Sequence, residues 1–62
     1  HTDPQFASEA YYNRSKAQWR LWRLTGEQQH FDRAVEDANM ALTKYYDKTF
    51  QSWAEFLQGN AP

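Results

Sequence analysis

The sequence has 62 residues, no cysteine, and a net charge of −1 that results from seven basic and eight acidic side chains. A chain of this length forms one small domain, residues 1–62, and without disulfides or thiolate metal sites its stability is expected to depend on association with other chains. The balanced charge excludes an electrostatic basis for binding nucleic acid or an anionic membrane, and no apolar run is long enough to span a bilayer.

The first predicted helix runs from Gln5 to Leu24, because no residue in this range breaks a helix. Thr2 or Asp3 is expected to cap its start. Pro4 then lies in the first turn, where the missing N–H of proline costs nothing. The sequence therefore predicts one unbroken helix before the first glycine.

This first helix is apolar on two sides. One apolar stripe recurs at helical spacing and consists of Phe6, Ala10, Ala17, Leu21 and Leu24. Tyr11 and Trp22 lie to one side of this stripe, whereas Tyr12 and Trp19 lie nearly opposite it. A helix with two apolar sides is expected to pack between neighbours and not on a single core.

A second helix is predicted to begin between Gln28 and Asp32, after Thr25-Gly26 ends the first, because glycine adopts the conformation of a helix C-cap at little steric cost. Its apolar residues form one continuous stripe: Phe31, Ala34, Val35, Ala38, Ala41, Leu42 and Tyr45. Small residues let helix axes approach closely, so they are expected at the seam of a helical hairpin. The predicted seam consists of Ala10, Ala17 and Leu21 from the first helix and Phe31, Ala34, Ala38, Ala41 and Leu42 from the second.

Residues 8–46 carry the spacing of a known helical repeat. The motifs are Asn13-Arg14-Ser15, Trp22, Thr25-Gly26 and Phe31-Asp32-Arg33-Ala34-Val35, followed by Ala38, Ala41 and Leu42. In these motifs the sequence resembles a tetratricopeptide repeat, in the longer variant found in large bacterial and fungal signalling proteins. Arg14 and Ser15 replace the Leu-Gly pair of that variant, and the proline turn after its second helix is absent. The resemblance implies a helical hairpin whose apolar faces are covered by neighbouring repeats or by other chains.

Residues 47–58 form a third, amphipathic helical segment. Its large apolar residues are Phe50, Trp53, Phe56 and Leu57. No Gly or Pro occurs between Asp32 and Gln58, so the segment can continue the second helix without a break, which is the arrangement that we favour. Asp47 or Thr49 can instead cap a separate helix that covers the exposed face of the hairpin. The predicted fold class is therefore all-α: a helical hairpin followed by a continuation of its second helix or by a third packing helix.

Residue patterns for catalysis are absent from the sequence, which has no glycine-rich phosphate loop, no Gly-x-Ser-x-Gly motif and no cysteine nucleophile. His30 has no second histidine or cysteine at ligand spacing, so it is expected in a solvated turn and not at a metal. The carboxylates of Asp32, Glu36 and Asp37 lie near a helix start, where they are expected to stabilise the helix dipole. We therefore expect no enzyme, no cofactor and no metal site.

The sequence leaves two non-enzymatic functions open. In the first, the chain is a protein-interaction module or scaffold that buries aromatic helix faces on a protein partner, since a few Trp and Tyr residues usually dominate binding. The candidate partner-binding residues are Tyr11, Tyr12, Arg14, Trp19, Trp22, Phe50, Trp53, Phe56 and Leu57. In the second, the chain is a structural subunit that binds further copies of itself through its C-terminal aromatic residues. Either function makes the chain part of an oligomer or a larger assembly, and a soluble, cytoplasmic location is favoured.

Overall fold

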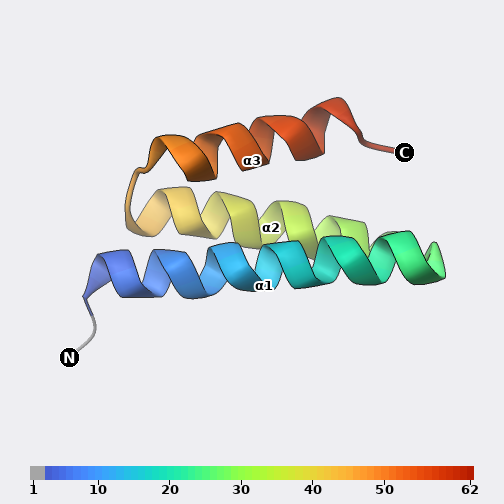
Figure 1. Cartoon of the computed structure of the whole chain (residues 1–62), viewed down its shortest axis with the longest axis horizontal. Helices are drawn as coiled ribbons and strands as arrows, with labels where there is room; N and C mark the ends of the chain where they lie inside the picture. The colour runs from blue at the N-terminus through green and yellow to red at the C-terminus, as the bar shows by residue number, and fades with distance from the viewer. Residues whose placement is uncertain (1–2) are drawn as a thin grey trace.

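Three α-helices make up the part of the chain that the structure, a computed structural model, describes, namely residues 3–62. They are α1 (Pro4–Thr25), α2 (Gln28–Lys44) and α3 (Lys48–Gly59). α1 and α2 form an antiparallel hairpin, and α3 turns back along α2, which lies between the other two helices in the view of Figure 1. The predicted all-α fold, a hairpin with a C-terminal helix, is confirmed.

Both ends of α1 follow from local chemistry. The Asp3 carboxylate accepts a hydrogen bond from the backbone N–H of Gln5 at 2.9 Å and so caps the helix, and Pro4 occupies its first turn. At the other end Gly26 has φ 75° and ψ 8°, the left-handed conformation that glycine adopts without strain, and its N–H donates to the Trp22 carbonyl at 2.7 Å. Thr2, the alternative cap, lies outside the described residues.

The chain reverses direction between α2 and α3, so the favoured continuous helix is wrong and the alternative third helix is present. α2 ends at Lys44, and Tyr45 adopts an extended conformation with φ −162° and ψ 122°. This conformation is open to any residue, so no glycine or proline is needed. The Asp47 carboxylate then accepts from the Thr49 N–H at 2.8 Å and starts α3.

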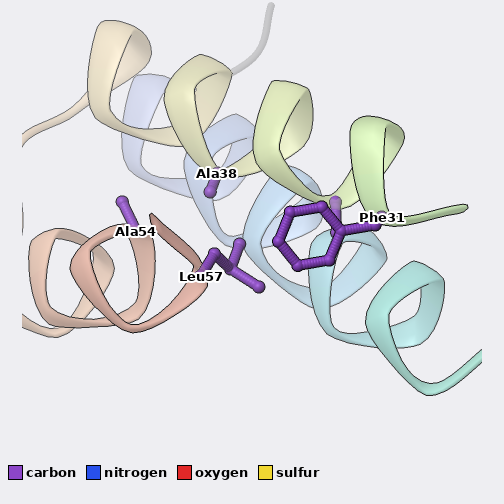
Figure 2. Close-up of a cluster of buried hydrophobic side chains, with 5 residues drawn as sticks. Phe31, Ala38, Ala54 and Leu57 are labelled. Carbon is purple, nitrogen blue, oxygen red and sulfur yellow. The ribbon is translucent and has the colours of Figure 1, made fainter. Parts of the chain in front are cut away.

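The hydrophobic core lies between α2 and α3. Its buried residues are Phe31, Ala34 and Ala38 from α2 and Ala54 and Leu57 from α3. Figure 2 shows Leu57 pointing from α3 toward the α2 surface between Ala38 and Phe31. Leu57 is the largest fully buried side chain among the described residues. Burial of the apolar face of α3, which includes Ala54 and Leu57, against α2 therefore stabilises the sharp turn before α3.

The seam between α1 and α2 contains two fully buried serines, Ser8 and Ser15, which lie about two helical turns apart on α1. The Ser8 hydroxyl donates to the Ala41 carbonyl at 2.7 Å, and the Ser15 hydroxyl donates to the Ala34 carbonyl at 2.6 Å. Because serine is small and each hydroxyl finds an acceptor, the helices approach closely without leaving these polar groups unpaired.

The predicted seam needs correction on α1. Ala10, Ala17 and Leu21 are exposed, on the side of the helix opposite to Ser8 and Ser15. On α2, four of the predicted seam residues are buried and Leu42 is half-buried; the buried four are Phe31, Ala34, Ala38 and Ala41. The prediction for α1 is wrong because it chose the more apolar stripe of the helix. The side that packs on α2 is the one with Ser8 and Ser15, which are small and can donate hydrogen bonds to α2.

Candidate interaction surface

Most of the aromatic side chains that the sequence assigns to a partner pack on one another between α1 and α3. The ring of Tyr12 lies 4.8 Å from that of Phe50, measured between centroids, and the ring of Trp19 lies 5.8 Å from that of Trp53. Trp19 also meets Phe56 at 5.7 Å in an edge-to-face arrangement. Such aromatic pairs add about 0.5–1.5 kcal/mol beyond the burial of their area. The aromatic face of α1 that carries Tyr12 and Trp19 and the aromatic face of α3 therefore cover each other.

This internal packing corrects the candidate site at its C-terminal end. Phe50 and Leu57 are buried, so neither side chain is available to a partner. Trp22 packs against Phe31 of α2, with ring centroids 5.1 Å apart. Phe50 and Leu57 are buried because α3 folds back, whereas a continuous helix would have carried its aromatic residues beyond the hairpin. Trp22 is covered within the hairpin itself.

The Ser15 hydroxyl connects all three helices. It donates to the Ala34 carbonyl of α2 and accepts from the indole N–H of Trp53 in α3 at 2.8 Å. The indole N–H of Trp19, in contrast, is buried and has no hydrogen-bond partner within residues 3–62. The apolar pattern of the sequence does not predict this role of Ser15, although the seven-residue spacing of Ser8, Ser15 and Trp22 is a signal that indicates it.

We expect Ser15→Ala to lower the free energy of unfolding by about 1 kcal/mol more than Ser8→Ala does. The two serines are matched, because both are fully buried and both donate to an alanine carbonyl of α2, but only Ser15 holds an indole N–H. Urea denaturation followed by circular dichroism measures the difference. Equal losses for the two variants would show that the bond from Trp53 adds no net stability.

A double-mutant cycle isolates that bond. Ser15→Ala and Trp53→Phe should couple, because each removes one partner of the same hydrogen bond. Ser8→Ala combined with Trp53→Phe supplies the control, since the Ser8 hydroxyl donates to the Ala41 carbonyl and not to Trp53. The coupling of these two substitutions should be close to zero.

Arg14 and Asp37 form an ion pair between α1 and α2. The guanidinium donates twice to the carboxylate, from Nε at 2.9 Å and from Nη2 at 2.8 Å. The Asp37 side chain is buried and that of Arg14 is largely exposed. These hydrogen bonds, together with the charge of the carboxylate, raise the pKa of Arg14 above its usual value. Asp37 lies in the middle of α2 and not near its start, as the sequence suggested. Its carboxylate holds Arg14 beside Tyr11, with the guanidinium carbon 5.3 Å from the ring centroid.

Two further cations of α1 cover the outer faces of its aromatic residues. The Lys16 ammonium lies 4.5 Å from the centroid of the Tyr12 ring, and the Arg23 guanidinium carbon lies 5.2 Å from that of Trp19. Cations placed over ring faces in this way are attracted by the ring quadrupole. Tyr12 and Trp19 are therefore only half-exposed and already have contacts on both sides.

Three of the six large apolar side chains that are exposed within residues 3–62 lie in the α1 stripe, which consists of Phe6, Ala10, Ala17, Leu21 and Leu24. Phe6 is 67% exposed, Leu21 40% and Leu24 83%, and both alanines are exposed. At the N-terminal end a shallow hollow of about 380 Å³ adjoins the stripe; it is lined by Phe6, Ala7, Ala10, Tyr11 and Arg14. The sequence identifies this stripe as apolar and assigns three of its residues, Ala10, Ala17 and Leu21, to the hairpin seam, whereas the structure leaves them exposed.

The other polar candidates form one contact across the hairpin and one within α2, and His30 is half-buried in the first turn of α2 and not in a solvated turn as expected. Nδ1 of His30 lies 2.9 Å from Oε1 of Gln18, and the Asp32 carboxylate accepts from the Gln28 side chain at 3.1 Å. Within residues 3–62, no three His, Asp or Glu side chains are grouped as metal ligands. None of the three described helices is long and apolar enough to cross a membrane. The comparisons with known proteins find no matching family model, no similar curated protein and no similar solved structure.

Proposed function

We propose that this chain is a non-enzymatic protein-interaction module and that the α1 stripe is its binding surface. The observation that supports the proposal is the row of exposed apolar side chains along one face of α1. Phe6, Leu21 and Leu24 are all exposed on one face of a single helix, with only alanine as the other apolar residue of that face. Exposed apolar side chains that gather on one face of a helix in this way mark sites of protein association.

The opposite side of α1 makes this surface rigid. Ser8 and Ser15 bond to α2, and Tyr12 and Trp19 pack on α3, so the helix that carries the stripe is held along most of its length. A preorganised surface loses little conformational entropy on binding. Arg14 lies at the edge of the stripe, where its fixed guanidinium offers a polar contact.

Site-specific photocrosslinking tests this function. A photoreactive phenylalanine analogue placed at Ala17 lies in the stripe, whereas the same residue placed at Ser52 lies on the exposed side of α3. We expect crosslinks to protein from position 17, to another copy or to a different chain, and few from position 52. Equal yields at both positions, or none at either, would contradict the proposal.

A second candidate is a unit of a tetratricopeptide-like array, in which a preceding hairpin of a longer chain covers the α1 stripe. The close approach at Ser15 favours it, because this residue takes the place of the small glycine in the repeat that the sequence resembles. Its hydroxyl lies 2.6 Å from the Ala34 carbonyl, so the helices meet closely at that point. Flanking sequence from the encoding gene tests this candidate, which requires further copies at a spacing of about 34–44 residues.

A further inference from the structure

We propose that the partner of the α1 stripe is a second copy of this chain, paired through α1 in an antiparallel, two-fold symmetric dimer. The proposal rests on the proposed interaction function and specifies its occupant. Three features of α1 support it: the order of residues in the stripe, the hollow beside it, and the charges along its other edge.

Four of the five residues of the stripe are spaced symmetrically about one point of α1, and Leu24 lies outside this symmetric set. Phe6 and Leu21 lie equally far from the midpoint between Asn13 and Arg14, and so do Ala10 and Ala17. A two-fold axis through this midpoint places Phe6 against Leu21 of the second copy and Ala10 against its Ala17. A symmetric dimer needs such a self-complementary surface, because each contact occurs twice with the roles exchanged. The alanine pairs near the axis allow the two helices to approach closely.

The hollow beside the stripe fits this register. Leu21 lies toward the same edge of α1 as Ala7 and Arg14, which line the hollow. In an antiparallel pair, each edge of a helix meets the same edge of its partner. Leu21 of the second copy, placed opposite Phe6 by the two-fold axis, therefore projects toward this apolar hollow. The two Arg14 side chains lie near the axis, where the ion pair with Asp37 offsets the charge of each.

The other edge of the stripe carries charges that complement themselves. Glu9 lies in the N-terminal half of α1, and Arg20 lies on the same edge in the C-terminal half; both are exposed. Antiparallel pairing brings Glu9 of each copy close to Arg20 of the other, with Lys16 nearby. In a parallel pair the two residues would be separated by about 16 Å along the helix axis. The charge pattern therefore favours a second copy in the antiparallel orientation.

Sedimentation equilibrium of the purified chain at low salt tests the dimer. We expect a concentration-dependent equilibrium between monomer and dimer for the natural sequence. Ala17→Glu should abolish the dimer, because it places a carboxylate against Ala10 of the second copy. Ser52→Glu, which adds the same charge on the exposed side of α3, should leave the dimer unchanged. Circular dichroism verifies that both variants remain helical.

A charge-reversal pair tests the orientation. Glu9→Lys alone and Arg20→Glu alone should each weaken the dimer by about tenfold, because each brings like charges together at two symmetric positions. An equimolar mixture of the two variants should restore dimerisation, since each altered charge then meets its opposite. The mixture rescues only if Glu9 and Arg20 face each other across the interface.

The outcomes separate this inference from the proposed function. A natural chain that stays monomeric at all concentrations overturns the dimer, and crosslinks from position 17 to a different protein would then leave the interaction function intact. A dimer that Ala17→Glu does not disrupt, or that the mixed variants fail to restore, overturns the antiparallel α1 pairing.

Discussion

Truncation of Leu57 to alanine should lower the free energy of unfolding by about 2–5 kcal/mol. Leu57 is fully buried, and it lies in the core cluster with Phe31 and Ala38 of α2. Its removal leaves a cavity between α2 and α3, because the surrounding helices relax only partially. A domain of this size has little stability in reserve, so the variant should be largely unfolded, or should retain α3 only loosely, at room temperature. Urea denaturation monitored by circular dichroism and by tryptophan fluorescence measures the loss.

Leu24→Ala provides the matched control for this prediction. It deletes the same atoms from a side chain that is 83% exposed, so its effect on the isolated monomer should stay within about 0.5 kcal/mol. The comparison must be made at a concentration where the chain is monomeric, since Leu24 belongs to the α1 stripe. Equal destabilisation by the two variants would mean that α3 is not docked on α2 in solution.

The helices themselves follow from local sequence signals. Asp3 caps α1, Gly26 ends it in the left-handed conformation, and the continuous apolar stripe of α2 faces the core as its period predicts. Each of these features depends on residues within a few positions of one another. Local chemistry therefore suffices to place α1 and α2.

The packing of α1 could not be predicted with the same success, because two of its sides are apolar. Phe6, Leu21 and Leu24 make one side look like the seam, yet Ser8 and Ser15 form it. A hydrophobicity pattern treats serine as polar, whereas a serine hydroxyl that donates to a carbonyl of the facing helix is compatible with full burial. The choice between the two sides depends on acceptors in α2, which lie 33 residues from Ser8 and 19 residues from Ser15 in the chain.

The candidate partner-binding site could not be predicted either, because it also depends on contacts between residues that are far apart in the chain. The sequence assigns Tyr12, Trp19 and Trp53 to a partner chain, but in the structure Tyr12 and Trp19 of α1 pack on Trp53 of α3. The turn that makes this possible contains no glycine or proline, so only the Asp47 cap indicates it. Once these residues are paired, Phe6, Leu21 and Leu24 remain exposed together on one face of α1.

Substitution of Ala38 by leucine should destabilise the fold by about 1–3 kcal/mol through overpacking. Ala38 is 1% exposed and belongs to the core cluster with Ala54 and Leu57, so the added atoms should push α3 away from α2. The sequence alone assigns Ala38 to the contact with α1, whereas Figure 2 shows its side chain directed toward α3. Asn39→Leu, which places the same side chain on the exposed side of α2, is the control and should change stability by less than about 0.5 kcal/mol.

Combining Ala38→Leu with Leu57→Ala distinguishes a shared packing site from two independent ones. The double variant moves a leucine side chain from α3 to the facing position on α2, so the total core volume is conserved. If the two residues fill the same space, as their common cluster indicates, the double variant should be more stable than the sum of the single losses predicts, by about 0.5–3 kcal/mol. Additive losses would show that the overpacking at position 38 acts on a different neighbour, namely α1, and that α3 docks in another register. The same denaturation experiment measures all four chains of this cycle.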